Sequence, residues 1–306
     1  MSGPRVARGR AHARAALVGN PSDGYGGRTI ALIVRNFAAE VRLRRPRYSA
    51  IQRRENGLGR LTEAAGARFR LHCEQSAAPA VPCLEAVVET DIPREVGLGG
   101  SSAIVIATLR ALSAANGTRL EPDLLAEIAL AAETEELGIA AGPQDRVVQA
   151  REGAVYMDLA PGANRFEQLD PKLLPPLFVA YRTQAAQPSA DVHARLRERF
   201  ERGDPETIAV ISEIAELASR AREALLAGDH DELGELMRAN VEARARIVAV
   251  EPRQMRMVEI ADELGLPSNY AGSGGAIVGI AAAERIDEIR AAFARERCEV
   301  IVPRVT

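Results

Sequence analysis

The sequence predicts an α+β protein of two lobes, with an N-terminal lobe over residues 1–170 and a C-terminal lobe over residues 171–306. The 306 residues, 47% of them hydrophobic, are enough for one large domain or two moderate ones. Strand-like runs alternate with helical patterns in the first part of the chain, whereas helical patterns dominate from about residue 190. This change in character favours two lobes with a boundary near residue 170.

The first part of the chain contains both kinds of element. The stretch "ARAALVGNPSDGYGGRTIALIVRNFAAEVRLR" predicts a strand, a polar turn and a second strand, because turn-forming residues separate two apolar runs. Further strands are predicted at "CLEAVVETDI", "GAVYMDL" and "PPLFVAYR". Apolar residues recur at helical spacing from Ser101 to Asn116, and Pro122 and Asp123 open a second helix, "EPDLLAEIALAAETEELGI".

The second part is predicted to be mostly helical. Helical patterns occupy "ADVHARLRERF", "PETIAVISEIAELASRAREALLAG", "HDELGELMRANVEARARIVAV" and "PRQMRMVEIADELG". The strand "AIVGIAA" then follows a glycine-rich stretch, and the helix "RIDEIRAAFARER" and the strand "CEVIVPRV" end the chain.

Composition excludes several classes of function. A formal net charge of -3 gives no overall positive field for a nucleic acid, and no apolar run approaches the roughly 20 residues of a membrane span. Lys172 is the only lysine, which argues against a lysine-dependent mechanism. Cys73, Cys83 and Cys298 lack metal-type spacing and predict reduced thiols in a cytoplasmic protein. Residues 1–15 are rich in arginine; a short tail entering the first strand is favoured over a transit peptide.

The stretch "GLGGSSAIV" places a glycine-rich loop directly before a helix. Gly97, Gly99 and Gly100 would let backbone N–H groups face a ligand, and the helix start adds unpaired donors and partial positive charge. Such a loop is typical of a phosphate site. Ser101 and Ser102 would either cap the helix or donate to phosphate or Mg²⁺. On this stretch alone, a simple turn with a helix cap is an equal alternative.

Three further segments carry candidate polar residues. Asp23 lies in the turn-rich "GNPSDGYGG", with Arg14 on the preceding strand, and an aspartate in such a turn is most often structural. Asp145 follows Gln144 in "GPQDR", where it would accept a proton from an alcohol or pair with Arg146. The stretch "YAGSGGAIVGI" is a second glycine-rich loop, which would cover a phosphate. Glu133 and Glu136 precede "GPQDR" and are either metal ligands or solvated helix charges.

In this order, "GNPSD", "GLGGSSA", "GPQD" and "GSGGA" resemble the motifs of the GHMP kinases, the superfamily of galactokinase, homoserine kinase and mevalonate kinase. Within it, "GNPSDGYGGRTIALIVRNFAAEV", "LGIAAGPQDRVVQAREGAVYMDL" and "LMRANVEARARI" are most similar to the glucuronokinase type. The resemblance implies an N-terminal lobe like ribosomal protein S5 and a ferredoxin-like C-terminal lobe. It also implies ATP- and Mg²⁺-dependent phosphorylation of the anomeric hydroxyl of D-glucuronate.

The resemblance also implies roles for individual residues. Asp145 would be the catalytic carboxylate, and Arg14 matches the basic residue of the first motif. Ser102 and Glu133 would hold Mg²⁺, with Glu136 competing for the second position. Asp23 and Gln144 would bind the sugar. The ATP phosphates would be bound by Gly97, Gly99, Gly100, Ser101, Ser102, Gly272, Gly274 and Gly275.

A sugar acid requires a cation for its carboxylate, and arginine suits bidentate binding. The candidates are Arg28, Arg182, His193 and Arg195. Kinases for other small alcohols, an ATP-dependent decarboxylase and a non-catalytic sensor of sugar or nucleotide are the alternatives. We expect the protein to act as a monomer or homodimer on a small molecule, without nucleic acid or membrane partners.

Overall fold

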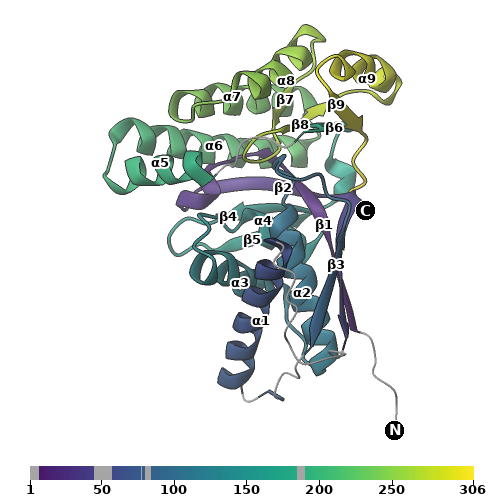
Figure 1. Ribbon diagram of the computed structural model, residues 1–306. Coiled ribbons are helices and arrows are strands. Elements are labelled where there is room, and N and C mark those ends of the chain that lie inside the picture. The colour runs from purple at the N-terminus through teal and green to yellow at the C-terminus, as the bar shows by residue number, and fades with distance from the viewer. Residues whose placement is uncertain (1–6, 45–56, 77, 80–83, 185–189) are drawn as a thin grey trace. The chain divides into compact units, whose positions relative to one another are not determined.

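The computed structural model describes residues 7–44, 57–76, 78–79, 84–184 and 190–306 (Figure 1). Contacts divide the chain into two compact units that alternate along the sequence. The first comprises Met1–Ala13, Phe37–Ile92 and Gly99–Arg151, and the second Arg14–Asn36, Pro93–Leu98 and Glu152–Thr306. The single boundary at residue 170 stays a prediction.

A five-stranded sheet runs through the first half of the chain in the order β1-β2-β4-β5, with β3 also paired to β2. Its strands are β1 (Ala7–Val18), β2 (Arg28–Arg44), β3 (Glu85–Thr90), β4 (Ala154–Asp158) and β5 (Arg165–Leu169). The long strand β2 changes partner along its length: Arg28–Leu32 pair with β4, and Ala39–Arg44 pair with β3. The strands predicted around "IALIV", "CLEAVVETDI" and "GAVYMDL" are therefore confirmed.

The helices of the first unit pack around α2 (Gly100–Asn116), whose apolar side chains are almost all buried. Its neighbours are α1 (Gly57–Gln75), α3 (Pro122–Ala131) and α4 (Gln144–Arg151). The chain approaches α2 closely at Gly9, because a Cβ there would lie 2.0 Å from the Ala107 carbonyl oxygen. The predicted second helix is α3, opened by Pro122, and it continues as a π-helical turn, η2 (Ala132–Glu136). Helices α1 and α4 were not predicted from the sequence.

The second unit holds a four-stranded antiparallel sheet in the order β7-β8-β6-β9. Its strands are β6 (Leu177–Arg182), β7 (Ser268–Tyr270), β8 (Ala276–Ile280) and β9 (Cys298–Ile301). Along the chain, β6 is followed by a group of helices, then by β7 and β8, and finally by a helix and β9. This is the β-α-β-β-α-β arrangement of a ferredoxin-like sheet, as predicted.

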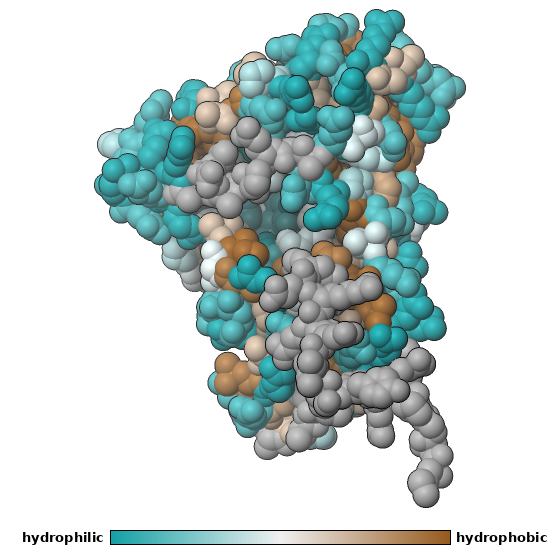
Figure 2. Space-filling view, in the orientation of Figure 1, coloured by the Kyte–Doolittle hydropathy of each residue, from teal (hydrophilic) through white to brown (hydrophobic). Residues whose placement is uncertain are grey.

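Two apolar clusters stabilise the second unit. Helices α8 (Pro252–Glu263) and α9 (Ile286–Ala294) cover the sheet, where Phe178, Met257 and Phe293 are buried. Helices α5 (Ala190–Glu201), α6 (Pro205–Ala227) and α7 (His230–Ile247) form the other cluster. Figure 2 shows mostly hydrophilic residues on the visible surface of α5 and of the α8–α9 region. Short 3₁₀ turns complete the fold at η1 (Ser22–Tyr25), η3 (Pro171–Leu173) and η4 (Ala283–Arg285).

Some sequence predictions receive only a partial test. In the part of the chain that the structure describes, no helix combines the length and apolar character needed to cross a membrane. Cys73 and Cys298 are free and buried, whereas Cys83 lies outside the described residues, as do residues 1–6 of the arginine-rich N-terminus. The cytoplasmic location and the oligomeric state stay predictions.

The packing of β8 against β6 leaves no space for a side chain at Gly279. A Cβ at this position would lie 2.4 Å from Cε1 of Phe178, a buried ring that cannot move freely. We expect Gly279→Ala to lower the free energy of unfolding by about 1–3 kcal/mol in urea denaturation. Gly66→Ala is the control, because its nearest neighbour would be the flexible end of Arg70 at 3.5 Å. Gly66→Ala should raise the free energy of unfolding by roughly 0.5–1 kcal/mol, because glycine is unfavourable within a helix. Equal effects in both variants would contradict the packing argument.

Candidate active site

In the first unit, the glycine-rich loop ends at the start of α2, where the first backbone amides lack an intrahelical acceptor. Gly99 is the N-cap of α2 in the left-handed conformation, with φ 72°, and no side chain caps the helix. The first intrahelical bond runs from the Ala103 amide to the Gly99 carbonyl, so the amides between them have no intrahelical acceptor. Ser101 is exposed and does not cap the helix, which corrects one of the two roles considered for it. The helix start therefore suits an anion.

Ser102 and Gln149 both donate to the carbonyl of Gly99, the N-cap of α2. The Ser102 hydroxyl is fully buried and donates to the Gly99 carbonyl at 3.0 Å. Gln149 Nε2 donates to the same carbonyl at 2.9 Å and to the His12 carbonyl at 2.9 Å. These bonds join the start of α2 to α4.

Asp145 lies in the first turn of α4 and is half-buried. It stands four residues before Gln149, and residues at this spacing share one face of a helix. One turn of helix, about 5.4 Å, therefore separates it from the residue that binds Gly99. Gln144 is buried beside it, with Nε2 at 3.5 Å from one carboxylate oxygen. The sequence-predicted base and the sequence-predicted phosphate helix thus belong to the same unit and are joined by Gln149.

Glu133 is carried into the core of the first unit by the π-helical turn. Its side chain is fully buried and pairs through Oε2 with Arg146, whose Nε donates at 2.7 Å. Arg146 also donates to the Gly142 carbonyl at 2.8 Å. Glu136, the competing candidate, is exposed, and its Oε1 lies 2.8 Å from Arg68 Nε. π-helical turns are frequent at functional sites.

Glu133 and Ser102 are the groups of this unit that could hold a metal ion. Within the described residues, no three His, Cys, Asp or Glu side chains form a metal-binding group. Glu133 nevertheless has one buried oxygen, Oε1, that receives no hydrogen bond from the residues that the structure describes. Ser102 provides a hydroxyl oxygen in the same unit. A carboxylate and a hydroxyl fit Mg²⁺ as it is bound with substrate phosphates, when the protein supplies only one or two ligands.

In the second unit, Arg14 holds two glycine-rich segments together. Its guanidinium is buried, and Nη1 donates at 2.6 Å to the carbonyl of Gly97 and at 2.6 Å to that of Ala271. A Cβ on Gly272 would lie 2.4 Å from the Gly97 oxygen and 2.7 Å from Arg14 Nη1. A Cβ on Gly97 would in turn lie 2.8 Å from the Gly274 oxygen. Glycine is required here because the two backbones touch.

Arg244 on α7 is a central residue of this unit that the sequence analysis missed. It is buried, and Nη1 donates to Asn20 Oδ1 at 2.9 Å and to the Gly272 carbonyl at 2.8 Å. Its guanidinium lies 4.9 Å from the centre of the Tyr270 ring. Burial lowers the pKa of Arg244 to about 10, against the opposing effects of Tyr270 and Asp23. At neutral pH it is therefore a buried cation beside the turn that contains Asp23.

The turn with Asp23 is tied to the same helix. Asp23 is buried in η1, and Asn240 on α7 accepts from the Gly19 amide at 2.6 Å and donates to the Asn20 carbonyl at 3.1 Å. Asn269 donates to Asn240 at 3.1 Å. The stretch "LMRANVEARARI" contains both Asn240 and Arg244, but its helical periodicity alone does not indicate what these residues contact.

The predicted carboxylate-binding residues differ in their surroundings. Arg28 lies 3.0 Å from Asp158 and 3.6 Å from Glu216, so its charge is already paired. Arg182 is buried at the end of β6, with Nη1 at 3.5 Å from Glu251. Arg195 is exposed, and the side chain of His193 lies outside the described part of the chain. Arg182 is therefore the most buried of the described candidates.

Comparison with known proteins identifies the family. The chain matches the models of the GHMP kinases N terminal domain over residues 61–153 and GHMP kinases C terminal over residues 221–300. Glucuronokinase 1 of Arabidopsis thaliana is 36% identical over 88% of this chain and 83% of that protein. A mevalonate kinase of Saccharolobus solfataricus is 27% identical over 64% of this chain and 62% of that protein.

Solved structures share the fold. A galactokinase of Lactococcus lactis complexed with galactose superimposes with a TM-score of 0.82 at 16% identity, covering 98% of this chain and 94% of that one. The mevalonate kinase of Methanococcus jannaschii gives a TM-score of 0.76 at 17% identity, covering 98% of each chain. The fold class predicted from the sequence is confirmed.

The buried pair of Glu133 and Arg146 makes a prediction about stability. Arg146→Met should leave the Glu133 carboxylate buried and unpaired, and we expect a loss of about 3–5 kcal/mol in the free energy of unfolding. The double variant Glu133→Leu, Arg146→Met removes both charges and should recover most of that loss. Urea denaturation of the two variants measures the difference, and a double variant as unstable as the single one would show that the pair acts mainly through packing.

Proposed function

The chain belongs to the GHMP kinases, a family of small-molecule kinases, and we propose that it transfers the γ-phosphoryl group of ATP to the anomeric hydroxyl of D-glucuronate. The observation that carries this proposal is the 36% identity with an Arabidopsis glucuronokinase over most of both chains. The products would be ADP and glucuronate 1-phosphate. The anomeric oxygen forms the new bond to phosphorus as the bond between the γ-phosphorus and the bridging oxygen breaks.

The nucleotide phosphates are proposed to bind at the glycine-rich segments. In the first unit, the open amides after Gly99 and the positive end of α2 would neutralise phosphate charge. In the second unit, Gly272, Gly274 and Gly275 would contribute backbone groups held in place by Arg14 and Arg244. Phosphoryl transfer depends mainly on such positioning and charge stabilisation.

Asp145 is proposed to orient the anomeric hydroxyl and to accept its proton as the P–O bond forms. The first turn of α4, where Asp145 lies, favours a negative charge because the helix N-terminus is partially positive. Gln144 would orient the sugar from the same turn. Arg14 would add positive charge for the transferred group, and its bonds to Gly97 and Ala271 fix its position.

Mg²⁺ is proposed to be held by Ser102 and Glu133 together with substrate phosphates. When bound, it would neutralise charge on the phosphate oxygens. The ion pair with Arg146 leaves Oε1 of Glu133 as the available ligand oxygen. Unchanged Mg²⁺ dependence in the Glu133→Leu, Arg146→Met double variant would remove Glu133 from this role.

The first test of the mechanism is Asp145→Asn. Asparagine has nearly the same shape but cannot accept the proton, so we expect kcat to fall about 10²- to 10⁴-fold while ATP affinity and thermal stability stay close to those of the wild type. Steady-state kinetics and calorimetric titration with ATP measure both quantities. Asp231→Asn, on the exposed start of α7, is the matched control and should keep wild-type turnover. Near-normal turnover in the Asp145 variant would exclude it as the base.

The substrate is tested with a panel of acceptors at equal concentration. ADP release should be fastest with D-glucuronate, partial with galacturonate and much slower with glucose. The discrimination against glucose should exceed the roughly 10–200-fold effect of one missing methylene, because glucose leaves a buried cation unpaired. Mevalonate belongs in the panel because of the mevalonate kinase relative. A preference for mevalonate or a neutral sugar would contradict the glucuronate proposal but not the kinase assignment.

A further inference from the structure

A cavity of about 320 Å³ in the second unit is lined mainly by arginine. Arg182, Arg253, Arg295 and Arg297 line it, with Glu296 as the only acidic residue of the lining. Every residue of the lining belongs to the second unit, so the cavity is formed within that unit alone. The excess of positive charge indicates an anionic ligand.

Arg182 is the buried cation of this cavity. It ends β6 opposite Cys298 of β9 and is 8% exposed. Its Nη1 atom is buried and forms no hydrogen bond within the described residues, although the Glu251 carboxylate lies 3.5 Å away as an ion-pair partner. A buried donor in this state is costly, and an anion in the cavity would accept its hydrogen bond. Burial raises the pKa of the Cys298 thiol to about 11, so this neighbour is neutral at physiological pH and does not repel an anion.

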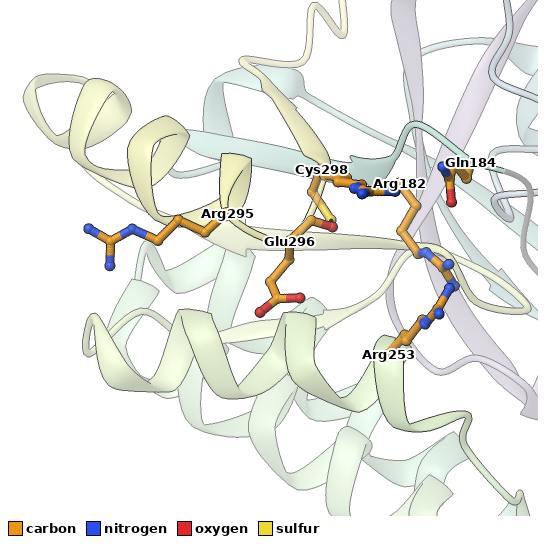
Figure 3. A pocket seen from close by; sticks show the side chains of 7 residues that line it. Arg182, Gln184, Arg253, Arg295, Glu296 and Cys298 are labelled. Carbon is orange, nitrogen blue, oxygen red and sulfur yellow. Dashed lines mark hydrogen bonds between the residues drawn. The ribbon is translucent and has the colours of Figure 1, made fainter.

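Arg253 brings a second cation beside Arg182. Figure 3 shows the two guanidinium groups pointing toward one another. Arg253 lies in the first turn of α8, which contains no acidic residue, and the preceding Glu251 does not cap the helix. The partial positive charge of a helix N-terminus disfavours a cation there and favours a phosphate. An anion between the two guanidinium groups would therefore relieve both repulsions.

Arg297 has a backbone conformation that is unusual for its residue type. Its φ is 56°, in the left-handed region that favours glycine, just after α9 ends at Ala294. The amide and the hydroxyl of Thr183, the residue after Arg182, donate to the Arg297 carbonyl at 3.1 and 3.0 Å. Arg297 is thus held beside Arg182 in a conformation that is costly for an arginine, and ligand binding by its side chain would offset that cost.

The charge balance of the whole lining favours a doubly charged ligand. Its four arginines are opposed by Glu296 and by Glu251 beside Arg182, so two positive charges remain. Figure 3 shows Arg295 projecting away from Arg182 and Arg253, so Arg295 contributes its charge from a longer distance. A phosphate monoester carries about -1.5 to -2 charges at pH 7, whereas a carboxylate carries one. Guanidinium groups also match the geometry of phosphate oxygens.

The cavity borders the second glycine-rich loop. The Arg182 amide donates to the Gly275 carbonyl at 2.9 Å. The side chain of Gln254, the residue after Arg253, lies against Gly274, where a Cβ would be 2.2 Å from Oε1. A nucleotide, whose phosphates are proposed to bind this loop, is therefore one source of a phosphate group for the cavity. Inorganic phosphate and a phosphorylated sugar are the others.

We propose that Arg182, Arg253 and Arg297 form a phosphate-binding site within the second unit. The buried Arg182 and the exposed Arg253 and Arg297 donate to the oxygens of one phosphate group. The site does not depend on which acceptor the kinase phosphorylates, so its failure and the failure of the proposed function are separate results.

The experiment is a calorimetric titration with inorganic phosphate at physiological salt, where unspecific attraction is screened. We expect the wild type to bind one phosphate and Arg253→Gln to bind it about 10- to 100-fold more weakly, because one charge-assisted contact is lost. The matched control is Arg290→Gln on the exposed face of α9, where Arg290 pairs with Asp287; it should bind phosphate as the wild type does.

A second variant separates binding from folding. Arg297→Gly should also weaken phosphate binding, but its unfolding midpoint in urea should equal or exceed that of the wild type, because glycine adopts the left-handed conformation without strain. A loss of affinity in this variant is then not a loss of structure.

Competition identifies the source of the phosphate group. Displacement of bound phosphate by ATP assigns the site to the nucleotide, displacement by glucose 1-phosphate assigns it to a sugar phosphate, and displacement by neither assigns it to free phosphate; each result supports the site. Absence of saturable phosphate binding to the wild type would overturn the proposal. So would equal affinities in the wild type, Arg253→Gln and Arg297→Gly, an equal loss in Arg290→Gln, or binding of glucuronate instead of phosphate that depends on Arg253.

Discussion

The hydrogen bonds from buried guanidinium groups to backbone carbonyls are the interactions on which the glycine-rich segments depend. Glycine lets a chain adopt irregular conformations, but it also leaves buried carbonyls outside helices and sheets, and each unsatisfied group costs about 1–3 kcal/mol. Arg14 satisfies the carbonyls of Gly97 and Ala271, and Arg244 satisfies that of Gly272. The close approach of the 97 and 272–274 backbones is stable because these donors lie beside it.

In the first unit, arginines likewise donate to backbone carbonyls of strand β1 and at the two ends of helix α4. Arg110 donates to the carbonyls of Arg10, Gln149 and Ala150, and Arg146 donates to that of Gly142 while pairing with Glu133. Arginine suits these positions because its planar guanidinium donates to several acceptors at once, and because it stays charged when buried. Lysine, with one point charge on a flexible stem, does not replace it in such positions. A chain with a single lysine is consistent with this dependence.

The sequence predicted the regular elements better than the contacts of the site. Strands β2, β4 and β8 and helix α2 follow from local apolar patterns, and the motifs led to Asp145, Ser102 and the glycine loops. Helix α4 was missed because its eight residues give too short a pattern. Arg244 and Arg253 were missed for another reason. A helical pattern indicates on which face of the helix a side chain lies, but not which distant residue it contacts. Arg244 donates to Asn20, and Arg253 points toward Arg182.

The glycines of the two loops are also explained by different constraints. Gly272 and Gly97 cannot carry a side chain because the opposite backbone occupies that space, whatever ligand binds. Gly100 differs: a Cβ there would meet only Ile92 Cγ2 at 3.5 Å, which is ordinary contact, and the residue has no positive φ. Glycine in a helix costs roughly 0.5–1 kcal/mol relative to alanine, so packing alone would favour alanine at this position. Under the proposed function, glycine at this position would instead let a phosphate approach the open amides of α2 closely.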